Sequence, residues 1–183
     1  MSILAQRLLA IHEALTRAQL PHSFGGAIAL AYCTEEPRGT RDLDVNVFSE
    51  PGNASDVLRA LPDEVTITPT DVDALEREGQ ARLWWDDTPI DLFLNVHELH
   101  QHAAREVRWV PFEGRTIPVL GCTPLVVFKA LLNRTKDWAD IEEMIAAGAG
   151  DIPSAIEWLE RILGAGDPIV ERLSSLADPG RVG

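Results

Sequence analysis

Two aspartates, Asp42 and Asp44, lie one residue apart in a run that alternates polar and apolar side chains over residues 41–48. Because side chains alternate faces along a strand, this run predicts a strand with one apolar and one acidic face. Two close carboxylates repel each other, and a cation between them relieves the repulsion. Oxygen ligands at this spacing suit Mg²⁺ or Mn²⁺. A solvated strand face is the alternative interpretation.

Asp91 is a third carboxylate of interest, since it lies among the strand-forming apolar residues of segment 89–94. A carboxylate in such a place is costly unless it is paired, exposed or bound to metal. With Asp42 and Asp44 in the same chain, we expect Asp91 to complete a metal site. An exposed position on a half-buried strand would explain it equally well when Asp91 is taken alone.

Gly25 and Gly26 separate a short extended segment, residues 22–24, from a helix predicted over residues 27–32. A helix that starts at glycines offers free N–H groups to a phosphate, although such a pair is more often a simple turn. Three carboxylates beside this helix start suit a nucleoside triphosphate held through two divalent ions. One ion would activate an attacking hydroxyl, and the other would stabilise the leaving pyrophosphate.

The periodicity of the remaining sequence predicts a mixed first part and a helical second part. Helices are expected over residues 3–19, 54–61 and 70–79, and strands over residues 43–48, 65–68, 81–85, 90–95, 107–112 and 116–120. From residue 123 the pattern is helical only, with helices over about 123–132, 136–147, 153–164 and 168–177. We therefore predict an α+β fold, with a small mixed β-sheet and flanking helices over residues 1–121. A C-terminal helical region, residues 122–183, would pack on this core.

The composition narrows the possible partners. The 183 residues carry a formal net charge of −13, which argues against electrostatic binding of nucleic acid over a broad surface. No stretch has membrane-spanning length, and the N-terminus lacks a signal-peptide core. Cys33 and Cys122 form no CxxC pair, so we expect reduced thiols, a cytoplasmic location and no membrane partner.

The order of these motifs resembles the signature of the polymerase-beta-like nucleotidyltransferase superfamily. That signature places a glycine pair before an Asp-x-Asp strand and a third acidic residue on a later strand. The motif Arg-x-Thr-x-Asp-x-Asp, which begins at Arg38, resembles the corresponding motif of the AbiEii- and MenT-type toxin branch. Residues 128–141 resemble the lysine-bearing helix of that branch and its following Lys-Asp-x-x-Asp segment.

The resemblance implies a nucleotide site in which Gly25 and Gly26 hold the triphosphate. Lys129 would contact the nucleotide phosphates, and Asp140 would orient Lys129 or another basic residue. Both predictions depend on the resemblance rather than on the spacing of the residues.

The resemblance also implies the catalytic and metal-binding roles. Asp42 and Asp44 would ligate Mg²⁺ or Mn²⁺, and Asp91 would ligate metal or act as the base. The enzyme would move a nucleoside monophosphate from an NTP to a hydroxyl on a tRNA 3′ end, a protein or a small molecule. The toxin branch would add a cognate antitoxin as a partner.

Alternatives to this interpretation remain open at the level of sequence. A catalytically inactive protein of the same fold would bind a nucleotide or a partner protein, and a nucleic-acid-binding regulator is a second rival. Arg38 would neutralise phosphate or pair with nearby acids. His97, His100 and His102 would form a solvated loop or a transition-metal site, and Trp85 is the best candidate for base stacking.

Overall fold

The computed structural model describes residues 1–37 and 39–178, so the expectation for Arg38 lies outside the described part. The described chain divides into two compact units. The first unit contains Met1–Ile28 and residues 39–120, and the second contains Ala29–Pro37 and residues 121–178. Helix α2 (Gly26–Thr34) begins in the first unit and ends in the second.

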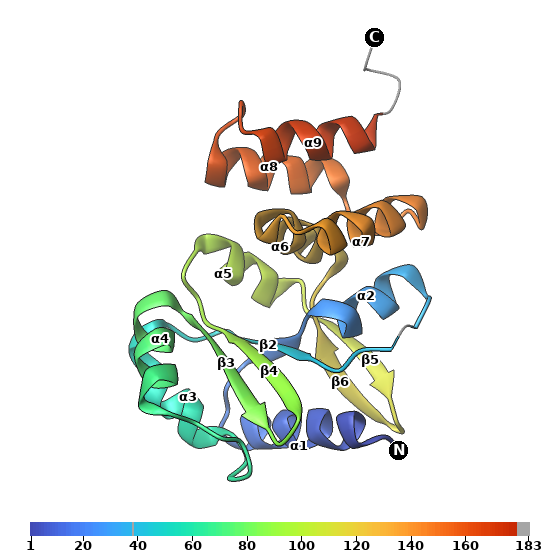
Figure 1. The fold of residues 1–183 in the computed structure, drawn as a ribbon. Helices are drawn as coiled ribbons and strands as arrows, with labels where there is room; N and C mark the ends of the chain where they lie inside the picture. Colours follow the sequence, from blue (N-terminus) through green and yellow to red (C-terminus); the bar gives the residue numbers. More distant parts are fainter. Residues whose placement is uncertain (38, 179–183) are drawn as a thin grey trace. The chain divides into compact units, whose positions relative to one another are not determined.

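The first unit is built on a mixed sheet, which has six strands within the described residues in the order β3-β4-β2-β1-β6-β5 (Figure 1). The strands are β1 (His22–Phe24), β2 (Leu43–Val47), β3 (Gln80–Trp85), β4 (Thr88–Phe93), β5 (Arg108–Phe112) and β6 (Arg115–Val119). Strand β2 runs antiparallel to β1 and parallel to β4. The predicted α+β fold class, with a small mixed sheet and flanking helices, is therefore confirmed.

Alternation along β2 gives the sheet its two faces, as the sequence predicts. Leu43, Val45 and Val47 are fully or almost fully buried, with exposed fractions of 0–1%. Ile90 and Leu92 are the register partners of Leu43 and Val45 on β4 and are equally buried. Helix α1 (Ile3–Arg17) runs along one side of this sheet (Figure 1).

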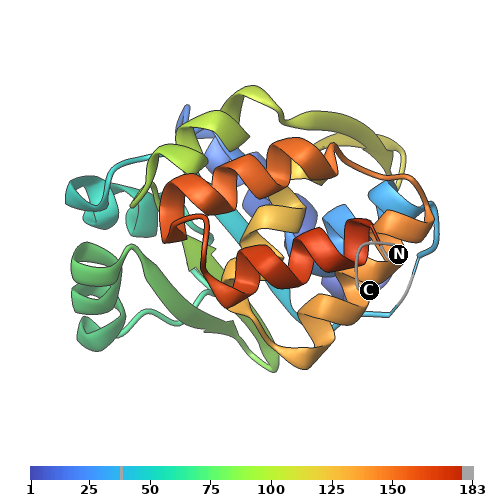
Figure 2. The same cartoon turned by 90° about the horizontal axis from the view of Figure 1, so that it is seen from above.

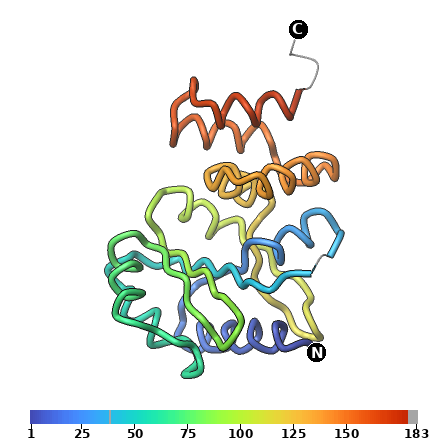
Figure 3. The backbone as a smooth tube through the Cα atoms, viewed as in Figure 1, coloured from blue at the N-terminus to red at the C-terminus, as the bar shows by residue number. Residues whose placement is uncertain are grey.

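Two hairpins supply the outer strands, and Figure 3 traces the chain through both. Strands β3 and β4 pair antiparallel, and Trp85 and Thr88 are the register partners next to their turn. The turn therefore consists of two residues, Asp86 and Asp87. Strands β5 and β6 pair in the same way around a second two-residue turn. Arg7 of α1 holds the first turn through ion pairs to Asp86 and Asp87 of 2.5 and 2.9 Å.

Two predictions for the first unit are wrong. The expected strand over residues 65–68 is reduced to an isolated bridge between Thr66 and Trp84. Thr68 is extended but forms a capping box with Asp71, so that helix α4 (Pro69–Glu78) begins directly after it and no strand continues there. The expected solvated loop with the three histidines is helix α5 (Glu98–Arg105).

Helix α5 forms because its N-terminus is capped and its apolar residues share one side. The Nδ1 atom of His97 accepts a hydrogen bond from the Leu99 N–H at 3.1 Å, which satisfies a free donor of the first turn. Leu99, His100 and Ala103 are buried. The remaining helix of the unit, α3 (Ala54–Ala60), follows a short 3₁₀ turn over Pro51–Asn53.

The second unit is helical. It contains the end of α2 together with α6 (Cys122–Leu132), α7 (Thr135–Ala146), α8 (Ile152–Leu163) and α9 (Pro168–Ala177). Helices α8 and α9 lie side by side (Figures 1 and 2). Trp138 of α7 is 1% exposed and is the largest fully buried side chain of the unit. The guanidinium of Arg172 lies 4.3 Å from the centre of its ring.

The expectation of reduced thiols is also wrong for this structure. Cys33 near the end of α2 and Cys122 at the start of α6 form a disulfide, although 89 residues separate them in the sequence. Their Cα atoms are 5.7 Å apart, within the range that a disulfide bridges. Spacing along the chain could not indicate this pairing, because it depends on how two distant helices meet.

Within the described residues, no helix is both long and apolar enough to cross a lipid bilayer.

Candidate functional site

Asp42, Asp44 and Asp91 lie on the same face of the sheet. Asp44 of β2 and Asp91 of β4 are register partners in a parallel pair, so their side chains point to the same side. Asp42 precedes β2 by one residue and shares a side with Asp44 because it is two positions away. All three carboxylates are half-buried. The structure therefore brings together the three acidic residues that the sequence singles out.

Gly25 and Gly26 follow β1 directly and meet the same acidic face. The Gly25 N–H donates to the backbone carbonyl of Asp44 at 2.8 Å, which extends the pairing of β1 with β2. Gly26 has a φ of 50°, and a Cβ atom there would lie only 1.8 Å from Oδ2 of Asp44. A side chain is thus excluded at Gly26, both by backbone conformation and by the adjacent carboxylate.

The absence of a side chain at Gly26 lets the N-terminus of α2 lie against the carboxylate of Asp44. Helix α2 starts at Gly26, and its first N–H groups have no partners within the helix. The partial positive charge at this end favours negative groups. A phosphate would be accepted here for the same reason.

Arg82, which was not predicted from the sequence, reaches the acidic face from the edge strand β3. Its position on β3 is the register partner of Asp91 on β4. Its Nε and Nη2 atoms donate to Oδ1 and Oδ2 of Asp91, each at 2.7 Å, in a two-pronged ion pair. Its Nη2 atom also lies 3.9 Å from Oδ2 of Asp42.

The neighbouring carboxylates change the pKa of Arg82. The hydrogen bond to Asp91 raises the pKa of Arg82, and the negative charges of Asp91, Asp42 and Asp44 act in the same direction. Arg82 is therefore a permanent positive charge that faces all three carboxylates.

These residues fit a divalent cation in donor chemistry. The carboxylate oxygens of Asp42 and Asp44 are the hard ligands that Mg²⁺ and Mn²⁺ prefer. However, within residues 1–37 and 39–178 no three His, Cys, Asp or Glu side chains are arranged to hold a metal ion together. Both oxygens of Asp91 are instead bonded to Arg82. Asp91 is thus engaged by Arg82 in this structure.

Lys129 and Asp140, predicted to act at the nucleotide, belong to the second unit and contact each other. Nζ of Lys129 lies 2.5 Å from Oδ2 of Asp140 and 3.8 Å from Oδ1 of Asp137. The side chains of all three are at least 93% buried. Arg134 forms a further ion pair with Asp137 at 2.6 Å. The predicted pairing partner of Lys129 is therefore present, and its phosphate-binding role stays a prediction.

The other candidates have packing roles in the structure. Trp85 lies beneath Arg7, whose guanidinium carbon is 5.7 Å from the centre of the indole ring. His97 caps α5, and His102 contacts Glu106 at 3.2 Å. Burial lowers the pKa of His100, which favours its neutral form.

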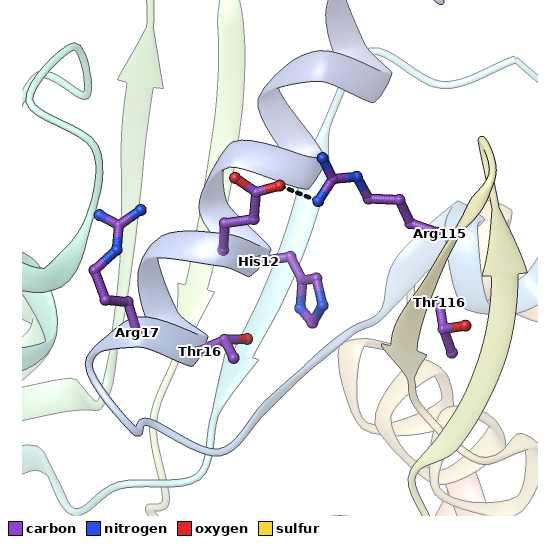
Figure 4. Close-up of a pocket in the computed structure, with 6 residues that line it drawn as sticks. His12, Thr16, Arg17, Arg115 and Thr116 are labelled. Atoms are coloured by element: carbon purple, nitrogen blue, oxygen red, sulfur yellow. Dashed lines mark hydrogen bonds and ion pairs between the residues drawn. The ribbon is translucent and has the colours of Figure 1, made fainter.

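A hollow of about 480 Å³ lies between α1 and β6 (Figure 4). It is lined by His12, Glu13, Thr16, Arg17, Arg115 and Thr116. Glu13 and Arg115 form an ion pair across it. None of these residues belongs to the acidic face, so the hollow does not bear on the chemistry of the aspartates.

The fold is that of known nucleotidyltransferases. No protein-family model and no curated protein matches this sequence. Among solved structures, it is similar to ANT(2″)-Ia in complex with adenylyl-2″-tobramycin, with a TM-score of 0.61 and 10% identity over 95% of this chain and 98% of that chain. A second similar structure is the lincosamide antibiotic adenylyltransferase LnuA with bound lincomycin, with a TM-score of 0.53 and 13% identity over 76% of this chain and 94% of that chain.

A third similar structure is TM1012 of Thermotoga maritima, with a TM-score of 0.50 and 14% identity over 78% of this chain and 92% of that chain. At such low identities the likeness is one of fold. The chain therefore shares its fold with these three structures.

Proposed function

We propose that this protein is an enzyme that transfers a nucleoside monophosphate from an NTP to a hydroxyl acceptor. The observation that carries the proposal is the position of Asp42, Asp44 and Asp91 on one sheet face, next to the N-terminus of α2. Because nucleoside triphosphates are intracellular substrates, the reaction would take place in the cytoplasm.

The reaction divides among the residues as follows. The backbone N–H groups at Gly25 and Gly26 would receive the triphosphate, with no side chain between the helix start and the phosphates. Asp42 and Asp44 would hold Mg²⁺ or Mn²⁺, which supplies charge neutralisation on the triphosphate. The acceptor oxygen would form a bond to the α-phosphorus, the bond to the bridging oxygen would break, and pyrophosphate would leave. Asp91 would ligate the ion or accept the proton of the acceptor hydroxyl.

We infer that the acceptor is a small molecule rather than a tRNA or a protein. Two observations support this choice. The structures of ANT(2″)-Ia and LnuA contain an adenylylated antibiotic and an antibiotic, and the first matches this chain over almost its whole length. The net charge of −13 also repels a polyanionic acceptor and favours a neutral or cationic one.

The test is transfer of label from α-³²P-labelled NTPs in the presence of Mg²⁺ to a panel of hydroxyl compounds that includes tobramycin, lincomycin and bulk tRNA. Asp42→Asn and Asp44→Asn should each lower the rate by about 10³-fold, because metal-ion catalysis contributes several kcal/mol. Asp56→Asn serves as the matched control, since Asp56 is an exposed acid of α3 that pairs with Arg59. A protein that neither binds nor transfers any NTP would overturn the proposal.

Binding without transfer would favour the inactive alternative, in which the fold holds a nucleotide or a partner. Isothermal titration with NTP and Mg²⁺ distinguishes the two. If affinity is measurable, no acceptor is labelled, and the two aspartate variants bind as the wild type does, the catalytic proposal fails and a binding role remains.

A finer proposal places the chain in the AbiEii- and MenT-type toxin branch. It is supported by the contact between Lys129 and Asp140, the two residues that correspond to that branch's helical motif. Expression of the wild-type protein should then arrest growth, and Asp42→Ala with Asp44→Ala should relieve the arrest. Co-expression of an adjacent small gene as antitoxin should do the same. Growth unaffected by the wild-type protein would contradict the toxin role and leave the small-molecule proposal intact.

A further inference from the structure

The acidic face contains its own cation. Three carboxylates, Asp42, Asp44 and Asp91, share one guanidinium, that of Arg82. The pairing with Asp91 uses both carboxylate oxygens at 2.7 Å, which is the strongest geometry available to an arginine and a carboxylate. This leaves neither Asp91 oxygen open to a cation without competition.

Arg82 makes one approach more than a simple cross-strand pair requires, because it also lies near Asp42. Opposite charges on neighbouring antiparallel strands often pair, and Arg82 with Asp91 satisfies that pattern. The hairpin is already held by its backbone ladder and by the buried partners Leu83 and Ile90. Yet the guanidinium also reaches to 3.9 Å from Asp42, which lies beyond β4 at the start of β2. The guanidinium therefore contacts Asp91 and approaches Asp42, and the charge of Asp44 acts on it as well.

Arg82 is also able to move. Its side chain is 49% exposed, and that of Asp91 is 20% exposed. Long, exposed arginine side chains change rotamer readily, and exposed ion pairs are weak because water competes for both partners. A divalent cation, with twice the charge, is a credible competitor for the same oxygens.

We propose that Arg82 is the resident counter-ion of this site, and that it competes with the divalent cation for Asp91. In the arginine-bound state, Arg82 holds both oxygens of Asp91, so that Asp91 does not serve as a ligand. In the cation-bound state, Arg82 releases Asp91, which then joins Asp42 and Asp44 as the third ligand. The inference rests on the proposed function, since it assigns the same three carboxylates to the cation. It explains why three suitable carboxylates gather on one face without forming a three-ligand group.

The experiment measures cation affinity without turnover. Mn²⁺ is titrated into the full chain in the absence of nucleotide, and free Mn²⁺ is followed by electron paramagnetic resonance. Arg82→Gln should tighten Mn²⁺ binding about 10-fold, because it removes a unit positive charge a few ångströms from the ion. Arg82→Lys, which retains the charge but loses the two-pronged geometry, should give a smaller gain. The lysine variant also keeps the test valid if the glutamine variant does not fold.

The matched control is Arg77→Gln. Arg77 lies on α4, is exposed, and pairs with the adjacent Glu78 at 3.6 Å. This substitution changes the net charge by the same amount as Arg82→Gln, so a general charge effect would appear in both variants. We expect Arg77→Gln to keep the wild-type affinity within about 2-fold, because exposed charges at a distance are screened.

A double variant tests whether the effect acts through Asp91. Asp91→Asn in the Arg82→Gln background should cancel most of the gain in affinity, because the released carboxylate is the one that tightens binding. If the wild type binds Mn²⁺ and Arg82→Gln binds it equally or more weakly, the counter-ion proposal is overturned. The metal-dependent function is then unaffected. If neither protein binds Mn²⁺, with or without NTP, the proposal fails together with the metal-dependent function.

Discussion

At the scale of single residues, Gly26 is a position where an added side chain would collide with Asp44. An alanine there would place its Cβ 1.8 Å from Oδ2 of Asp44 and would adopt a φ of 50°. We expect Gly26→Ala to lower the free energy of unfolding by about 2 kcal/mol or more, because a positive φ and a steric collision act together. Urea unfolding followed by circular dichroism measures the change.

Gly25→Ala is the control for this prediction. Its Cβ would meet Nδ2 of Asn46 at 3.1 Å and Cδ1 of Leu120 at 3.2 Å, which are tight contacts that small shifts relieve. Gly25 also lacks the positive φ of Gly26. Gly25→Ala should therefore cost less than Gly26→Ala, and equal losses would contradict the role given to the Asp44 carboxylate.

The three aspartates were accessible from the sequence because alternation along a strand fixes which side chains share a face. The role of Arg82 could not be predicted from the sequence, because its partner on the neighbouring strand depends on the length of one turn. The sequence suggests a four-residue turn between strands that end at Trp85 and begin at Ile90, and that register would place Arg82 opposite Phe93. The actual turn of two residues, with Asp86 at a φ of 49°, places it opposite Asp91. A two-residue change in turn length thus decides which residue faces the third carboxylate.

At the scale of elements, the disulfide between Cys33 and Cys122 joins the end of α2 to the start of α6. A cross-link between residues 89 positions apart restricts the unfolded chain strongly. Replacing both cysteines with serine should therefore lower the free energy of unfolding by roughly 2–5 kcal/mol under oxidising conditions. Chemical unfolding with and without a reducing agent measures the contribution.

The double serine variant also provides the control. Reduction should destabilise the wild type and leave the variant unchanged, since the variant has no bond to reduce. Two titratable thiols in the wild type purified from cytoplasm would show that the bond is absent there, as expected for a reducing compartment. A wild type whose stability ignores the reductant would contradict the predicted stabilisation.

Among the elements, the helices with strong periodicity were predictable, and those decided by local capping were not. The helices from residue 123 onward follow their apolar spacing and proline starts, as α8 shows with Asp151 as its N-cap. Helix α5 has few apolar residues, and its start depends on a hydrogen bond from Leu99 to the His97 ring. Such a cap is a matter of side-chain geometry, which residue type alone does not reveal.

At the scale of the whole molecule, the switch from mixed to purely helical periodicity near residue 121 was enough to predict the α+β class. Charge is the second property that acts at this scale. The chain carries a formal net charge of −13. A net negative charge repels a polyanion, which supports the proposed small acceptor over a nucleic acid.

Three histidines are held in environments that disfavour their charged form. Burial lowers the pKa of His12, His22 and His100 below the usual 6.5. Nδ1 of His12 lies 2.9 Å from Nε2 of His22, and Nδ1 of His22 lies 2.8 Å from the carbonyl of Leu20. A positive charge on His12 would lower the pKa of His22 further, because like charges repel each other.

The pH dependence of stability follows from these lowered pKa values. As the pH falls through 6.5, the unfolded chain takes up protons on these histidines before the folded chain does. The free energy of unfolding should therefore be highest above about pH 7 and should fall between pH 7 and 5.5. Urea unfolding at pH 7.5, 6.5 and 5.5 measures this slope, and His22→Gln should make it shallower because one of the three groups is removed. A free energy that stays constant or rises over this range would show that the histidines are not held neutral in the folded protein.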